Sequence, residues 1–127
     1  MKIVPFIYEE HANEVKAWGA KHEFPLPPKE FLPDVGLVVN DAAVGFVYTT
    51  NSKMAWIEWV FANPDKTAEE RKESLDHLMS ALEKVAIIGG MKVLFSASGT
   101  HAYREILGRN GFQETDKNMI HHVKGIG

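Results

Sequence analysis

The chain has 127 residues, a formal net charge of -3 at pH 7 and no cysteine. This length suits a single domain, residues 1–127, that is large enough to bury a core. The small negative charge does not favour a nucleic-acid partner. The lack of cysteine excludes disulfides, thiolate metal sites and a cysteine nucleophile, and it fits an intracellular, cytoplasmic protein. We also expect no membrane partner, because no apolar run is long enough to span a bilayer.

The first part of the chain predicts a strand, a helix and an irregular loop. Residues 2–7 are typical of a strand, and Pro5 suits an edge position or a bulge. Apolar residues recur at helical spacing between residues 9 and 22, which indicates a helix. Residues 23–33 contain four of the six prolines, so we expect an ordered loop there rather than a helix or a central strand.

Three strands in succession are expected next. Residues 35–40 and 42–50 are rich in valine and aromatic residues, and the pair Asn40-Asp41 between them is typical of a turn. Residues 53–62 predict the third strand of the same meander. An antiparallel sheet therefore occupies the middle of the chain.

A long central helix is the strongest prediction. It begins near Thr67 and ends at Gly89-Gly90, a common way to terminate a helix. Its apolar residues form one continuous stripe: Leu75, Leu78, Met79, Leu82, Val85 and Ala86.

The last part of the chain predicts a strand, a short helix and a hairpin. Residues 91–97 read as a buried strand and residues 99–109 as a helix. Residues 111–115 and 118–124 are expected to pair around a turn at Asp116-Lys117. The complete order is then β-α-βββ-α-β-α-ββ, an α/β class with a mixed sheet.

This order, together with three segments, resembles the GNAT family of acyl-CoA-dependent N-acyltransferases. The segment AAVGFVYTT resembles the family's second strand, and WIEWVFANP its fourth strand and the following turn. The segment LGRNGF resembles the closing signature, in which a helix ends just before Gly-Phe. The resemblance extends over nearly the whole chain, and the order of the segments is more specific than any one of them.

The resemblance implies a function and a binding mode. Family members transfer an acetyl group from acetyl-CoA to a small-molecule or protein amine. Their fourth and fifth strands splay apart, and the pantetheine arm pairs with the fourth strand, here at Val60, Phe61 and Ala62. The diphosphate binds amides at the start of the central helix, a general anion site.

Glu58 matches the position of the family's catalytic carboxylate on the fourth strand. A general base needs a pKa raised by burial and a place within reach of the amine. Trp56 and Trp59 could supply part of that apolar setting. The alternative is that Glu58 lies on the polar face of an alternating strand and has no catalytic role.

The expected phosphate loop departs from the family pattern. Thr67 falls on the Gln or Arg position, while Glu70 and Lys72 fall on two glycine positions where a cofactor approaches the backbone closely. Thr67 and Glu70 instead form the pattern of a capping box, which would use the same amide donors. Ala68 and Arg71 complete the expected cofactor contacts, and Arg71 and Lys72 are either anion ligands or simply solvated.

The leaving-group acid is also displaced from the family pattern. Counting back from Gly111-Phe112, the usual tyrosine position is Leu107, and Tyr103 lies one helical turn earlier on the same face. Tyr103 either replaces that tyrosine or packs in the core with a solvated hydroxyl. Thr100 stands where the family often has a pantetheine ligand, but it also suits a helix N-cap.

The histidines do not predict a metal site. They have no metal-ligand spacing, and His121 and His122 would point to opposite faces of a strand, so no metal site is expected.

The departure of the phosphate loop from the family pattern allows a second function. The chain could be a non-catalytic GNAT-fold interaction or structural protein of the kind found in tailed phages, with a protein partner. Residues 23–33 would then form a protein contact instead of shaping an acceptor site.

Overall fold

The structure, a computed structural model, describes residues 2–127. It contains one sheet with the strand order β1-β2-β3-β4-β5. The strands are β1 Ile3–Pro5, β2 Val35–Val39, β3 Ala43–Thr49, β4 Met54–Ala62 and β5 Val93–Phe95. Neighbouring strands pair antiparallel from β1 to β4, and β4 pairs parallel with β5. This is the mixed sheet that the sequence predicts.

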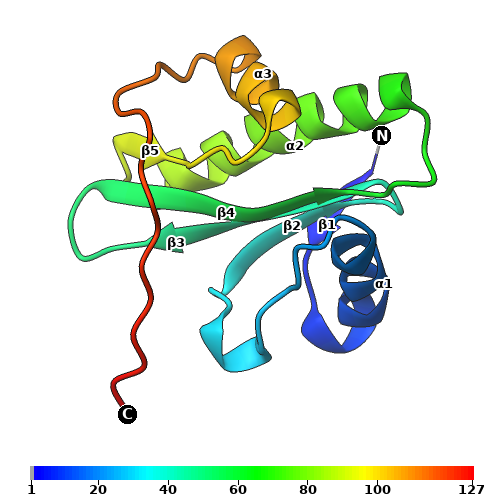
Figure 1. Ribbon diagram of the computed structural model, residues 1–127, viewed down its shortest axis with the longest axis horizontal. Coiled ribbons are helices and arrows are strands. Elements are labelled where there is room, and N and C mark those ends of the chain that lie inside the picture. Colours follow the sequence, from blue (N-terminus) through cyan, green and yellow to red (C-terminus); the bar gives the residue numbers. More distant parts are fainter. Residues whose placement is uncertain (1) are drawn as a thin grey trace.

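Three helices cover the two faces of this sheet (Figure 1). They are α1 Tyr8–Lys21, α2 Ala68–Ile88 and α3 His101–Arg109, and a short 3-10 helix, η1, spans Lys29–Phe31. Helices α2 and α3 lie on one face, here named the α2 face, and α1 lies on the other, named the α1 face. Within residues 2–127, none of the helices combines the length and apolar character that crossing a membrane requires.

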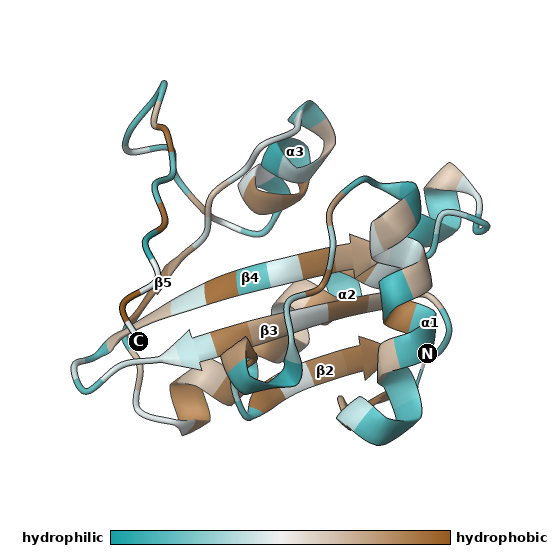
Figure 2. Cartoon of the chain, turned by 60° about the horizontal axis from the view of Figure 1, so that its bottom comes forward, coloured by the Kyte–Doolittle hydropathy of each residue, from teal (hydrophilic) through white to brown (hydrophobic). Residues whose placement is uncertain are grey.

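The core consists of two clusters, one on each face of the sheet. On the α2 face, Leu78 and Leu82 of the predicted apolar stripe are fully buried against β2, β3 and β4. On the α1 face, Val15 and Trp18 of α1 pack against Phe46. Figure 2 shows the resulting concentration of apolar residues in the central strands. Because both faces are covered, these strands are apolar along much of their length.

The turns and caps follow local sequence chemistry. The Ala42 amide donates to the Val39 carbonyl at 2.8 Å, and Asp41 adopts a positive φ of 48°, so the predicted Asn40-Asp41 turn is confirmed. Helix α2 ends at Gly89, and Gly90 follows it with a φ of 86°, a conformation that glycine adopts without strain.

The predicted C-terminal hairpin is wrong. Residues 110–127 contain no strand. The Phe112 amide donates instead to the Leu107 carbonyl at 3.0 Å and closes α3, so Phe112 is not available to begin a strand. The segment carrying His121 and His122 is therefore not a strand either, and the argument that these two side chains point to opposite faces does not apply. Its large apolar side chains are exposed: Met119, Ile120, Val123 and Ile126.

Candidate functional site

Strands β4 and β5 separate halfway along β4. Their pairing ends at Trp56 and Phe95, whereas β4 continues to Ala62. Just beyond the last pair, the Ser96 hydroxyl donates to the Ile57 carbonyl at 2.9 Å, so a side chain takes the place of the next backbone partner. The divergence of these two strands is what the family resemblance implied.

A bulge in β4 lies beside this opening. The pairing with β3 shifts register between Val44 and Phe46, and Trp59 has a positive φ of 56°. Such a backbone conformation is uncommon for a bulky residue and is characteristic of functional sites. Trp59 packs with the α1-face cluster, whereas Ile57 and Val60 pack with the α2-face cluster. The bulge therefore places two consecutive residues, Glu58 and Trp59, toward the α1 face.

Glu58 occupies a half-buried position in this part of β4. Burial raises the pKa of its carboxyl above the usual value of 4.5, and the charge of His121 opposes part of that effect. His121 belongs to the C-terminal segment, which runs beside the β4–β5 end of the sheet in Figure 1. A carboxylate with a raised pKa is a better proton acceptor than a solvated one, which is the property a general base needs.

Tyr103 approaches the same opening from α3. Its hydroxyl lies 2.7 Å from the Ser96 hydroxyl oxygen. Because the single Ser96 proton is donated to the Ile57 carbonyl, Tyr103 must be the donor in this contact. Burial raises the pKa of Tyr103 to about 12, an effect opposed by the Ser96 hydrogen bond and reinforced by the negative charge of Glu58. Tyr103 is thus protonated at neutral pH and its hydroxyl is bonded rather than solvated.

The family's usual tyrosine position lies in the core. Leu107 is 8% exposed and belongs to the α2-face cluster. A tyrosine at position 107 would bury its hydroxyl among apolar side chains, which is unfavourable without a hydrogen-bond partner. Tyr103, one turn earlier, is the helix residue whose hydroxyl reaches the end of β5.

A second tyrosine near Glu58 was not anticipated from the sequence. The Trp59 indole N–H donates to the Tyr48 hydroxyl at 2.8 Å, and Tyr48 in turn donates to the Phe31 carbonyl at 2.7 Å. Burial raises the pKa of Tyr48, and the charge of Glu58 adds to this. These bonds connect the β4 bulge to η1 in the proline-rich loop. Tyr48 could have been found from the alternation of β3, since Phe46 and Tyr48 share a face.

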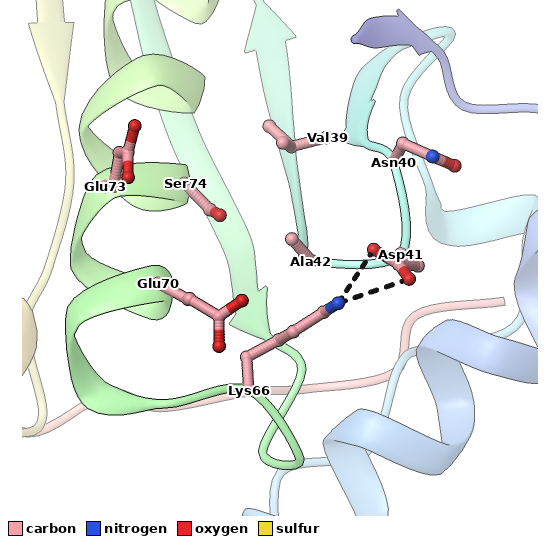
Figure 3. Close-up of a pocket in the computed structure, with 8 residues that line it drawn as sticks. All are labelled: Val39, Asn40, Asp41, Ala42, Lys66, Glu70, Glu73 and Ser74. Atoms are coloured by element: carbon pink, nitrogen blue, oxygen red, sulfur yellow. Dashed lines mark hydrogen bonds and ion pairs between the residues drawn. The ribbon is translucent and has the colours of Figure 1, made fainter. Parts of the chain in front are cut away.

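The start of α2 is closed by its own side chains, as the capping box predicts. The Thr67 amide donates to a Glu70 carboxylate oxygen at 3.0 Å, and the Glu70 amide donates to the Thr67 hydroxyl at 3.1 Å. Figure 3 shows the adjacent hollow, about 200 Å³ in volume, with Glu70 and Glu73 on one side and Asp41 on the other. Lys66 also lines this hollow, but three carboxylates and one ammonium leave the lining negative, which is unfavourable for a diphosphate.

Two of the three basic residues at the start of α2, Lys66 and Arg71, have partners within the protein. The Lys66 ammonium forms an ion pair with Asp41 at 3.3 Å. The Arg71 guanidinium donates to the carbonyls of Pro64 and Lys66 and so braces the turn before α2. Lys72 is exposed on the helix surface. Arg71 is therefore placed as a structural brace, and its guanidinium is turned toward the protein's own backbone.

The other predicted cofactor contacts are divided between roles. The Thr100 hydroxyl accepts from the Tyr103 amide at 3.2 Å and caps α3. Phe61 and Ala62 pair with β3, and His22 donates to the Ala62 carbonyl at 3.0 Å. Val60 lies at the bulge, outside the regular β3 pairing.

Ala68 forms the first turn of α2. Within residues 2–127, no three histidine, aspartate or glutamate side chains gather in a way that could hold a metal ion.

Comparison with known proteins supports the fold. No protein-family model matches the sequence, and no curated protein matches it. The chain is similar in structure to the protein TTHA1254 of Thermus thermophilus, with a TM-score of 0.73, 15% identity and 100% of both chains covered. It is also similar to an aminoglycoside 6'-N-acetyltransferase of Acinetobacter haemolyticus, with a TM-score of 0.67, 16% identity and 100% of both chains covered.

A Trypanosoma brucei acetyltransferase aligns with a TM-score of 0.64 at 12% identity, over 96% of this chain and 99% of its own. At such identities the similarity establishes architecture. Together with the separation of β4 and β5, it shows that the chain has the fold of the GNAT acyl-CoA N-acyltransferases.

Proposed function

We propose that the protein is an N-acetyltransferase that moves an acetyl group from acetyl-CoA to an amine. The observation that carries this proposal is the arrangement around the β4–β5 opening. Glu58, whose pKa is raised by burial, lies on β4 where the two strands separate, and the protonated Tyr103 hydroxyl reaches the end of β5 from α3. A proton acceptor and a proton donor at one opening match what acyl transfer requires.

In the proposed reaction, Glu58 removes a proton from the acceptor ammonium, directly or through water. The free amine nitrogen attacks the thioester carbonyl carbon, and a C–N bond forms while the C–S bond breaks. Tyr103 turns its O–H from Ser96 to the leaving sulfur and gives it a proton, so that CoA departs as a thiol. The nitrogen still carries one proton more than the amide needs and releases it to water, and water returns a proton to the Tyr103 phenolate. Glu58 gives its own proton to solvent, so that the reaction releases one proton in all. Proton transfer of this kind typically contributes about 10²–10⁴-fold in rate.

The residues fit one part of acetyl-CoA better than the other. Beyond Trp56, β4 has no β5 partner, so its backbone can pair with the pantetheine amides. At the start of α2, the capping box uses the amides of Thr67 and Glu70, whereas those of Ala68 and Glu69 make no hydrogen bond among residues 2–127. Two amides and the helix dipole can hold a diphosphate weakly. The proposed binding mode relies on the pantetheine arm.

The test is a comparison of Glu58→Gln with Glu14→Gln. Glu14 is an exposed residue of α1, so its substitution controls for the loss of one carboxylate. We expect turnover of acetyl-CoA with a panel of primary amines to fall about 10²–10⁴-fold in Glu58→Gln alone. The Kd for acetyl-CoA, measured by calorimetry, should be the same in both variants. Equal turnover in both variants would remove Glu58 from the mechanism.

A second function is favoured by one specific observation, the closed start of α2. A capping box that occupies amide donors, an arginine that braces the loop and three carboxylates around the neighbouring hollow are unfavourable for CoA. A non-catalytic GNAT-fold protein that contacts another protein through residues 23–33 would have these features. Calorimetry with acetyl-CoA distinguishes the two: saturation supports the enzyme, and no heat at millimolar ligand supports the interaction protein.

A further inference from the structure

Three aromatic residues occupy a row of neighbouring register positions across the α1 face of the sheet. Trp56 of β4 is the register partner of both Tyr48 on β3 and Phe95 on β5. Directly paired residues point to the same face. The Trp56 and Phe95 rings stack with centroids 4.7 Å apart and an interplanar angle of 24°. The strands that carry this row lie side by side in Figure 1.

The row has one exposed ring and is fixed by hydrogen bonds at its Tyr48 end. Trp56 is 41% exposed although it stacks on Phe95. Tyr48 is fixed at the other end, because it donates to the Phe31 carbonyl and accepts from the Trp59 indole. Cross-strand ring pairs stabilise a sheet, and that accounts for the stacking. It does not account for a large ring surface that stays open to solvent beside a half-buried carboxylate.

Glu58 lies next to this row on the same face. It is two residues beyond Trp56 along β4, a separation of about 7 Å. Its partner on β3 is Phe46, which is fully buried, so the carboxylate marks the inner border of the open surface. A ligand that rests on the Trp56 ring can therefore place a positive charge at Glu58 across a short arm.

We infer that the acceptor is an arylalkylamine: an aromatic ring joined to a primary amine by an arm of two or three carbons. This rests on the proposed acetyl transfer. The ring stacks on the exposed face of Trp56, and the ammonium forms an ion pair with Glu58, the proposed base. A polyamine carries charge along its whole length and needs several carboxylates. Glu30 and Asp34 line a hollow beside Tyr48, but Trp56 and Phe95 do not line it, so a ligand on the Trp56 ring has Glu58 as its carboxylate. A ring with one terminal charge matches this surface.

The test measures binding of 2-phenylethylamine, 2-cyclohexylethylamine and spermidine to the full chain by calorimetry, without acetyl-CoA. The first two differ only in whether the ring is aromatic. Stacking beyond simple burial should make 2-phenylethylamine bind about 2- to 10-fold more tightly than 2-cyclohexylethylamine. Trp56→Leu should abolish that preference and Trp56→Phe should retain it. Ile88→Ala is the control, because Ile88 is an exposed apolar residue of α2, the helix on the opposite face.

The outcomes separate this inference from the proposed function. An aromatic preference that disappears in Trp56→Leu supports an arylalkylamine site on Trp56. If no acetyl transfer is detected in that case, the proposed function fails and the site stands as a binding site only. Acetylation of spermidine without any preference for the aromatic amine overturns the acceptor class and leaves acetyl transfer standing. Absence of both binding and turnover overturns both. A preference that persists in Trp56→Leu also overturns the inference, because the ring then binds elsewhere.

Discussion

The start of α2 offers a direct test of whether a helix cap and a CoA site compete for the same amides. The change is the double substitution of Glu70 and Lys72 by glycine. It removes the carboxylate that accepts from the Thr67 amide at 3.0 Å. The released amide can donate one hydrogen bond to a charged phosphate oxygen, a contact that contributes about 1.5–3 kcal/mol. The Kd for acetyl-CoA should therefore fall about 10- to 100-fold.

The same double substitution should lower stability. A glycine inside a helix costs about 1 kcal/mol relative to alanine, and a chain of this size loses about 3–6 °C of melting temperature per kcal/mol. The matched control replaces Glu83 and Lys84, two exposed residues in the C-terminal half of α2, by glycine. Both variants should melt about 6–12 °C below the parent, and E70G/K72G a few degrees lower still because only it breaks the capping box.

The assays are thermal denaturation followed by circular dichroism and a calorimetric titration with acetyl-CoA on all three proteins. Competition between cap and cofactor requires that affinity rises only in E70G/K72G. If the parent already binds at micromolar concentration and E70G/K72G binds no more tightly, the reasoning is wrong. The Glu70 carboxylate would then point away from the bound diphosphate.

Three further predictions concern the opening and the core. The raised pKa of Glu58 means that the folded state holds this proton more tightly than the unfolded chain, so stability is lost as pH rises through the raised pKa. Glu58→Gln should therefore melt above the parent at pH 7, and the difference should vanish below pH 4.5; a constant difference across a pH series of melting curves would contradict the burial argument. Tyr103→Phe should reduce acetyl transfer about 10²-fold while urea unfolding changes by about 1 kcal/mol, and unchanged turnover would exclude it as the acid. Gly36→Ala should lower the free energy of unfolding by about 1–3 kcal/mol, because an added Cβ would lie 2.5 Å from the Phe46 ring. Gly99→Ala, which has open space, is its control in the same urea titration.

Much of the fold could be predicted from the sequence because it depends on interactions between residues that are close along the chain. The stripe from Leu75 to Ala86 has one period and predicts one buried helix face, and that helix begins at the Thr67 capping box. The Asn40-Asp41 turn fixes how β2 pairs with β3. These features require only neighbours in sequence, which is why the residues alone were sufficient.

The C-terminal hairpin was mispredicted because strand-like composition is not enough. Met119, Ile120 and Val123 have the composition of a strand, yet they stay exposed and unpaired with the sheet. A strand needs a partner, and β5 is only three residues long, Val93–Phe95. Tertiary context decides whether such a segment joins a sheet.

Only part of the candidate site could be predicted from the sequence. Glu58 was recognisable from its place on the fourth strand. Its environment, however, depends on a bulge at Trp59, which no residue pattern in the sequence predicts. Ser96 was not anticipated, because its importance comes from bonding Ile57 across the strand opening. Contacts between residues 39 positions apart arise only after the sheet forms.

The β4–β5 opening and the start of α2 satisfy unpaired backbone groups in opposite ways. At the β4–β5 opening, one Ser96 hydroxyl satisfies the Ile57 carbonyl and the strand beyond it keeps an edge that a ligand can pair with. At the start of α2, the Thr67 and Glu70 side chains satisfy the donors themselves. Buried or helix-terminal polar groups need partners in either case. A ligand that gains most of its affinity along β4 and little at α2 is what this division of partners favours, and the acceptor surface around Trp56 lies at the end of β4 where the strands still pair.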